Sequence, residues 1–272
     1  MNSRIPKRII HIWGGGKHDL SLVSKAAVVN VKLLNPDFEY MFFDDPGIET
    51  FTKKHFPEYQ NVFRSFRMPI QRYDFFRYLA VFHYGGFYLD LDVLLVSSLS
   101  SLLKFGCVFP FEELTLYKFL RRKYGMDWEI GNYAFGAAAG HPFILAIIEN
   151  CVRAQKEPEW AKAMMKSIPW IFRKDFYIFN TTGPGLVSRT LAEYPLAAKQ
   201  VKVLFPENVC DSANWHRFGT FGVHLMSGTW LERKGVLGRR LTKLWMLRTR
   251  KRMLKESLSL GGSRTLEFKK KA

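Results

Sequence analysis

Several common signatures are missing from this 272-residue sequence. Its three cysteines, Cys107, Cys151 and Cys210, are widely spaced and form no Cys-x-x-Cys pair, which suggests neither a disulfide framework nor a zinc site. No apolar run is long enough to span a bilayer, and no internal repeat indicates a solenoid or propeller. The basic opening is followed by too short an apolar stretch for a signal peptide. We therefore expect a cytoplasmic protein, in a reducing compartment or peripheral on the inner face of the cell membrane.

Positive charge is abundant but unevenly spread. The net charge is +17, and the segment from Arg233 to the C-terminus holds 14 Lys and Arg against two Glu. We expect one catalytic body over residues 1–232 and a basic amphipathic helix or tail over residues 233–272. A basic helix that carries Leu and Trp suits an anionic membrane surface. A solvated tail without a membrane role is the alternative.

Apolar β-branched runs alternate with helical patterns along the body. The pattern predicts strands at residues 7–13, 38–45, 87–96, 106–111, 132–139, 201–206 and 221–226. It predicts helices at residues 19–34, 69–83 and 141–156, and a loop at residues 179–185 that leads into another helix. Such alternation favours an α/β fold with a mostly parallel central sheet flanked by helices.

The stretch GGFYLDLDV at residues 85–93 places two carboxylates in an apolar run. On a strand, Asp90 and Asp92 point to one face together with Tyr88. Two neighbouring carboxylates repel each other, and a divalent cation resolves the repulsion. Mg²⁺ and Mn²⁺ prefer oxygen ligands and often bind carboxylates together with substrate phosphates. We therefore expect a site for Mn²⁺ or Mg²⁺ and a diphosphate, with surface aspartates at a strand end as the alternative.

The preceding helix adds a second charged pair. Asp74 and Arg77 are three residues apart and share a helix face. Because the helix is largely apolar, we expect specific partners for this pair, such as sugar hydroxyls, rather than an ordinary surface ion pair. Gly85 and Gly86 permit positive φ angles and the close approach of a ligand.

These stretches resemble a known family. RYDFFRYLAVFHYGGFYLDLDV is similar to the signature of the glycosyltransferase family 32 sugar-binding region, with Tyr73 where the family has a small residue. The opening IPKRIIHIWGGG resembles the N-terminal element of the family, although His11 stands one place off. FGVHLMSGTW resembles the closing H-x-x-x-G-S-W element, with Thr229 in place of serine.

The resemblance implies a GT-A type fold and a metal-dependent, retaining transferase that uses a nucleotide-diphosphate sugar. It assigns Asp90 and Asp92 to the metal and diphosphate, with His224 completing that site. It places Asp74 and Arg77 on the sugar hydroxyls, so these four charged residues are the catalytic candidates. It also places Trp13 near the nucleotide base and Trp230 at the leaving phosphate.

Further candidates come from the residues themselves. Tyr88 lies on the aspartate face and is a donor contact, while Trp13 and His224 also suit a buried core. Asn132 and the loop at residues 181–185 follow expected strand ends, where α/β sheets bind ligands, and are candidates for the acceptor side. No general base is evident.

The function we expect is transfer to a saccharide or lipid-linked saccharide during the synthesis of a bacterial surface polysaccharide, such as capsule or lipopolysaccharide. Two alternatives remain. One is a protein that binds nucleic acid or an anionic membrane through the basic tail, although no specific nucleic-acid motif occurs. The other is a metal-dependent sugar-nucleotide hydrolase.

Overall fold

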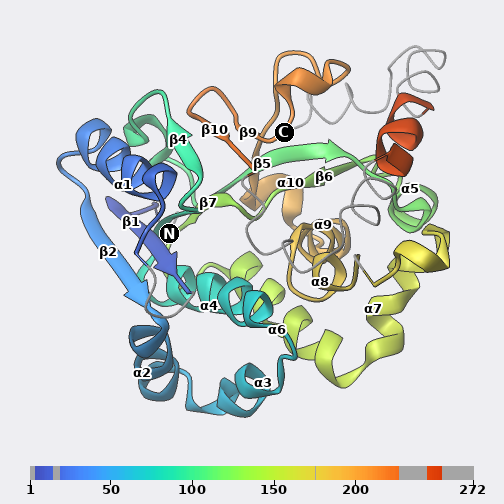
Figure 1. Cartoon of the computed structure of the whole chain (residues 1–272), viewed down its shortest axis with the longest axis horizontal. Helices are drawn as coiled ribbons and strands as arrows, with labels where there is room; N and C mark the ends of the chain where they lie inside the picture. Colours follow the sequence, from blue (N-terminus) through green and yellow to red (C-terminus); the bar gives the residue numbers. More distant parts are fainter. Residues whose placement is uncertain (1–3, 15–18, 175, 227–243, 253–272) are drawn as a thin grey trace.

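The computed structural model describes residues 4–14, 19–174, 176–226 and 244–252 (Figure 1). Its strands form a large mixed sheet and a small three-stranded sheet. The strands are β1 (Arg8–Trp13), β2 (Glu39–Asp44), β3 (Gly86–Leu89), β4 (Val93–Leu95), β5 (Cys107–Leu114), β6 (Trp128–Ile130), β7 (Ala134–Ala137), β8 (Lys202–Leu204), β9 (Arg217–Phe218) and β10 (Gly222–His224).

The large sheet has the order β2-β1-β3-β7-β5-β6, with β8 paired to β5. The pairs β1–β2, β1–β3 and β5–β8 are parallel, whereas β3–β7, β5–β7 and β5–β6 are antiparallel. The α/β class is thus confirmed, but the sheet is mixed rather than mostly parallel. The segment from β5 to β6 contains the helix α5 (Lys118–Tyr124) and yet returns antiparallel, so the alternation of strands and helices did not establish parallel pairing here.

The predicted single strand at residues 87–96 is two strands. The main-sheet strand ends at Leu89, and β4 belongs to the small sheet, of order β4-β10-β9. Between them the chain turns, and the amide of Val93 donates to the carbonyl of Asp90 at 3.0 Å. The two aspartates therefore lie in a turn between two sheets, and the prediction that they share the face of one strand is wrong.

The N-terminal helices follow the sequence pattern closely. Helix α1 (Leu22–Leu34) begins after Ser21, whose side chain accepts a hydrogen bond from the amide of Ser24. After β2 the chain forms α2 (Asp45–His55), a 3₁₀ turn and α3 (Gln60–Ser65). Helix α4 (Pro69–Tyr84) is buried on most sides and ends at Gly85, whose φ is 66°. This helix therefore carries Asp74 and Arg77 through the interior of the protein.

The C-terminal helices cover one side of the sheet. They are α5 (Lys118–Tyr124), α6 (Pro142–Lys156), α7 (Pro158–Met164), α8 (Phe176–Thr181), α9 (Pro184–Glu193) and α10 (Ala197–Gln200). The predicted loop at residues 179–185 is mostly helical, because α8 and α9 nearly adjoin there. The apolar sequence of α8 packs against the helices α6 and α9, a tertiary effect that Gly/Pro content did not indicate.

Alternate residues of the central strands face two different cores. Ile10 and Tyr88 join the larger core on the side of α4 and α6, whereas Ile9 and Phe87 face the side of α1 and the small sheet. This period-2 division fixes the register of β1 against β3. It also anchors the chain on both sides just before it turns at Asp90.

Part of the basic C-terminal segment packs on the body. Residues 244–252 are helical, and Trp245 packs against Phe172 and Phe176. Arg250 forms an ion pair with Glu113 of β5. The expected division at residue 233 stays a prediction, and residues 227–243 and 253–272 lie outside the described residues. Among the residues that the structure describes, no helix has the length and apolarity that crossing a bilayer requires.

Candidate metal and donor site

The turn between β3 and β4 brings the two aspartates to one place. The amide of Asp90 donates to the carbonyl of Tyr133 at 2.7 Å, which ties the turn to the start of β7. The amide of Leu225 donates to the carbonyl of Asp92 at 2.9 Å, which ties the turn to the end of β10. The backbone of the DXD motif is therefore fixed from both sides.

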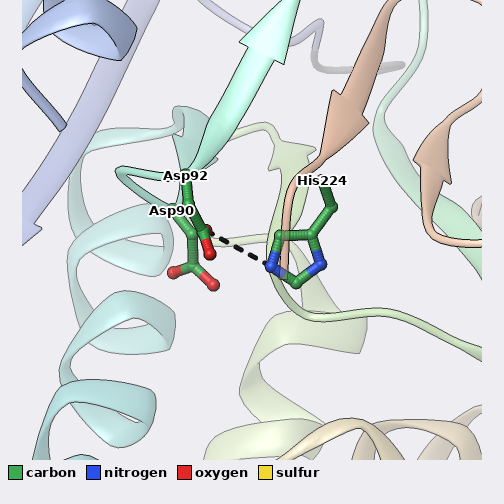
Figure 2. Close-up of side chains that lie close together, drawn as sticks. All are labelled: Asp90, Asp92 and His224. Atoms are coloured by element: carbon green, nitrogen blue, oxygen red, sulfur yellow. Dashed lines mark ion pairs between the residues drawn. The ribbon is translucent and has the colours of Figure 1, made fainter. Parts of the chain in front are cut away.

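His224 of β10 lies opposite the two carboxylates. Figure 2 shows Asp90 and Asp92 directed to the same side, with the imidazole facing them from the neighbouring strand. His224 Nε2 lies 3.3 Å from Asp92 Oδ1. Ligand atoms of the three residues all lie within 4.8 Å of one another. The structure thus brings together the three residues that the sequence assigned to the metal.

The three donors suit a divalent cation. Two carboxylates and one imidazole match the preferences of Mn²⁺ and Mg²⁺ for oxygen-rich sites, and the side chains are 15–26% exposed, which leaves them open to a ligand. Burial lowers the pKa of His224, but the hydrogen bond with Asp92 and the charges of Asp92, Asp90 and Glu112 together outweigh burial and raise it above its ordinary value. Burial also raises the pKa of Asp90. The raised pKa of His224 reflects the negative charge of Asp92 and Asp90 beside it, which a divalent ion would offset.

Arg77 joins the two charged motifs. Its guanidinium lies 2.9 Å from Asp74 Oδ1 and 3.2 Å from Asp90 Oδ1. It also donates to the carbonyl of Asn132 at 2.9 Å and lies over the ring of Tyr88. Burial opposes the charge of Arg77, but Asp90 and the other acidic groups around it together outweigh burial, so its pKa is raised. Arg77 therefore stays charged and holds Asp90 in place.

Asp74 is held by the protein itself. It is 4% exposed, and it accepts hydrogen bonds from Thr182 Oγ1 at 2.8 Å and from Asn132 Nδ2 at 3.3 Å. Asn132 also donates to the hydroxyl of Tyr78 at 3.0 Å. The predicted acceptor-side residue Asn132 and the loop residue Thr182 thus hold the carboxylate of Asp74 in place through hydrogen bonds. The predicted contact of Asp74 and Arg77 with sugar hydroxyls stays a prediction.

The two glycines serve packing in the structure. Gly85 and Gly86 have φ angles of 66° and 107°. A Cβ at Gly85 would lie 2.8 Å from Pro6 Cγ, and one at Gly86 would lie 2.8 Å from Arg8 Cβ. These contacts are at the start of β3, whereas Asp90 follows its end. The N-terminal segment thus approaches both glycines, and the approach of a ligand there stays a prediction.

Other predicted residues have different outcomes. The hydroxyl of Tyr88 donates to Asp90, so Tyr88 orients the carboxylate. Trp13 is the last residue of β1 and lies half-buried opposite Asp44 of β2, where its expected contact with the base is untested. His11, by contrast, is fully buried, and burial lowers its pKa to about 3. Trp230 lies outside the described residues.

Sequence reasoning missed the residues around His224. The ring of Tyr133 stacks on His224 with centroids 4.3 Å apart. His216 lies 3.1 Å from Glu112 through Nδ1, and its carbonyl accepts from the amide of His224 at 3.1 Å. Glycine suits position 131, because a Cβ at Gly131 would overlap both Glu112 and Tyr133. No local motif joins these residues, and only the fold brings them to the site.

Comparison with known proteins agrees with this geometry. Residues 24–109 match the family described as glycosyltransferase sugar-binding region containing DXD motif. The chain is 31% identical over 161 residues to mannosyl phosphorylinositol ceramide synthase CSH1 of Saccharomyces cerevisiae, over 59% of this chain and 36% of that protein. It is 27% identical over 213 residues to inositol phosphoceramide mannosyltransferase 1 of Schizosaccharomyces pombe, over 74% of this chain and 56% of that protein. The chain spans about a third of the length of the first of these relatives.

A solved structure of similar arrangement is the PaToxG glycosyltransferase. It matches with a TM-score of 0.49 and 17% identity over 72% of each chain. From the sequence matches alone, residues 24–109 correspond to a glycosyltransferase sugar-binding DXD region, and the chain is homologous to mannosyltransferases along part of its length.

Proposed function

We propose that the protein is a metal-dependent glycosyltransferase that moves a mannosyl group from a nucleotide-diphosphate sugar to a lipid-linked hydroxyl group. The main observation behind the proposal is that ligand atoms of Asp90, Asp92 and His224 lie within 4.8 Å of one another, beside the ion pair of Arg77 with Asp90. The names of the two fungal relatives support mannose as the sugar and a membrane lipid as the acceptor.

Each residue of the site has a defined part in the proposed reaction. A divalent cation, when bound by Asp90, Asp92 and His224, would hold the donor diphosphate and offset the charge of the leaving phosphate. Arg77 and Tyr88 orient Asp90 and favour its ionised form against the effect of burial. Asp74 fixes Arg77 and is itself fixed by Thr182 and Asn132. This rigid support limits the reorganisation that binding requires.

The proposal includes retention of configuration. The bond between C1 of the sugar and the phosphate oxygen breaks, and the acceptor oxygen forms a bond to C1 on the same face. The acceptor proton goes to the departing phosphate, which explains why the reaction needs no side-chain base. An α-linked donor then gives an α-linked product.

The proposed location of the reaction is the cytoplasmic surface of a membrane, where the lipid acceptor is available. A saccharide of a surface polysaccharide is the alternative acceptor of the same site. The basic segment at residues 233–272 supports attraction to anionic lipid.

The test is mannosyl transfer by the full-length protein. GDP-mannose and MnCl₂ are incubated with inositol phosphoceramide, with a lipid-linked saccharide or with no acceptor, and products are identified by mass spectrometry. UDP-glucose and UDP-N-acetylglucosamine serve as alternative donors. We expect a mannosylated product that the Asp90→Asn/Asp92→Asn variant does not form and that the Glu129→Gln variant does. Free mannose as the sole product would favour the hydrolase, and no turnover of any donor would contradict the proposal.

A further inference from the structure

Helix α1 is apolar on the side that faces away from the protein. Its inner face is formed by Ser24, Ala27 and Val31, which are buried. Its outer face carries Leu22 at 85% exposure, Val29 at 56% and Leu33 at 74%. Together with exposed Ala26, these residues recur at spacings of four, three and four, and so form one continuous stripe along the helix. A surface helix normally presents polar residues on this side.

The charges of α1 are of one sign. The helix contains no Asp or Glu, and it carries Lys25 and Lys32, both exposed. The two lysines are seven residues apart and therefore lie on the same flank of the apolar stripe. A stripe of aliphatic side chains bordered by lysines is typical of helices that lie in the interface of an anionic bilayer. The net charge of +17 draws the whole chain toward such a surface.

The apolar surface extends to the strand that follows the DXD turn. Asn30 accepts from the amide of Leu95 at 2.7 Å and donates to its carbonyl at 3.0 Å, which fixes α1 against β4. The next residue, Val96, is 66% exposed and continues the stripe. We call the set formed by Leu22, Val23, Val29, Leu33 and Val96 the α1 surface.

The orientation of α1 relates this surface to the site. Asn35 accepts from the amide of Leu99, and Asn30 pairs with Leu95. The helix and the chain from β4 onward therefore run side by side in the same direction. It follows that the N-terminal end of α1, with Leu22, lies toward Asp92. Leu225 and Met226, which directly follow His224, are also exposed apolar residues.

We propose that the α1 surface is a docking surface for an anionic lipid bilayer, which it enters with its aliphatic side chains while Lys25 and Lys32 contact the headgroups. Docking in this way places the DXD turn close to the membrane plane, where a lipid acceptor presents its hydroxyl group. Only the identity of the acceptor rests on the proposed function, because docking itself requires no transfer activity.

The α1 surface and the helix at residues 244–252 can be tested separately. Figure 1 shows them at opposite ends of the long axis of the molecule. In the C-terminal helix, Trp245 packs on Phe172 and Phe176 rather than facing outward. The C-terminal helix also exposes Leu244 at 47% and Leu247 at 44%, less than Leu22 and Leu33 of α1, so we expect the α1 side chains to enter the bilayer, even if the C-terminal segment adds electrostatic attraction.

The experiment uses a fluorescent label that reports its surroundings. An NBD group is attached to Leu22→Cys or Leu33→Cys in a full-length Cys210→Ser background, where the two remaining cysteines are buried. The matched control is Trp170→Cys, because Trp170 is 80% exposed and lies on another surface. Vesicles of phosphatidylcholine alone or mixed equally with phosphatidylglycerol are then added. We expect a blue shift of the α1 labels with anionic vesicles and no shift of the control label.

A second variant pair measures the contribution to affinity. Leu22→Gln/Leu33→Gln should weaken vesicle co-sedimentation about tenfold, because it removes apolar surface from the interface. Trp170→Gln/Ile171→Gln should leave it unchanged. Since all four side chains are exposed, neither pair should alter folding.

Several results would overturn the proposal. The α1 labels could show no blue shift of NBD emission while the protein sediments with vesicles. The label at Trp170→Cys could show the same blue shift as the α1 labels. The protein could also fail to sediment with anionic vesicles. A shift that grows with protein concentration in the absence of vesicles would assign the surface to a second copy instead. GDP-mannose binding measured without vesicles reports on the proposed function separately, so the two failures can be told apart.

Discussion

Two buried charge clusters of this protein share a composition but differ in layout. Each has three carboxylates, one arginine and one histidine. The DXD cluster consists of Asp74, Asp90, Asp92, Arg77 and His224, and the β5–β6 cluster consists of Glu112, Glu113, Glu129, Arg250 and His216.

In the β5–β6 cluster, each carboxylate is neutralised within the protein. Glu112 pairs with His216 at 3.1 Å, and Glu113 pairs with Arg250. Burial, and then the charge of Glu113 directly opposite, raises the pKa of Glu129 to about 8, so Glu129 is mostly protonated at neutral pH. No carboxylate charge is left over for an added ion.

In the DXD cluster, the arginine and the histidine are separated. Arg77 lies at the buried end between Asp74 and Asp90, whereas His224 lies at the open end beside Asp92. Among the described residues, donors converge within 4.8 Å at Asp90, Asp92 and His224 and in no other group of three. The comparison teaches that convergence of donors, rather than the number of charges, distinguishes a candidate cation site.

The largest difference should appear when each arginine is removed. Arg77→Met leaves Asp74 and Asp90 buried without a cation, and we expect a loss of about 3–5 kcal/mol in the free energy of unfolding. Arg250→Met acts nearer the surface, where the arginine side chain is 19% exposed, and should cost about 1 kcal/mol. Urea denaturation followed by circular dichroism measures both. Equal losses would mean that the two arginines stabilise their clusters to the same extent.

A smaller effect concerns pH and the β5–β6 cluster. The pKa of Glu129 is about 8 in the folded protein against an ordinary value of 4.5. The folded state therefore binds this proton more tightly, and the resulting stability is present below pH 4.5 and is lost as the pH rises through 8. Glu129→Gln removes this dependence.

We expect the melting temperature of Glu129→Gln to exceed that of the unmodified protein by roughly 10 °C more at pH 8.5 than at pH 5. Differential scanning fluorimetry at both values of pH measures the gap. A gap that is the same at both would place the raised pKa in doubt. Asp37→Asn, at an exposed ion pair with Lys7, is a control that should show no such gap over this range.

The smallest effect concerns two buried hydroxyl groups. Tyr88 donates to Asp90, whereas the hydroxyl of Tyr133 has no hydrogen-bond partner among the described residues. Tyr88→Phe should cost about 1 kcal/mol, and Tyr133→Phe should be close to neutral, because it removes a group that makes no bond. The reverse order in urea denaturation would contradict the assigned hydrogen bonds.

Much of the fold and part of the site could be predicted from local sequence. The pattern indicated helices at residues 19–34 and 69–83, where α1 and α4 lie, because capping and periodicity act over a few residues. The pairing of Asp74 with Arg77 followed from helical spacing for the same reason.

Features that depend on distant residues were not predictable. The turn at Asp90 escaped a period-2 argument because it depends on Tyr133 and Leu225. The bond between Thr182 and Asp74 joins residues 108 positions apart. The β5–β6 cluster likewise joins four separate segments, and no spacing rule connects them.

The most direct test of the central claim is isothermal titration of GDP-mannose into the full-length protein with and without MnCl₂. The same titration is repeated with Asp92→Asn and with Glu113→Gln, one carboxylate from each cluster. We expect Mn²⁺-dependent binding that falls at least about 100-fold in Asp92→Asn and changes little in Glu113→Gln. Binding that ignores Mn²⁺, or that falls equally in both variants, would contradict it.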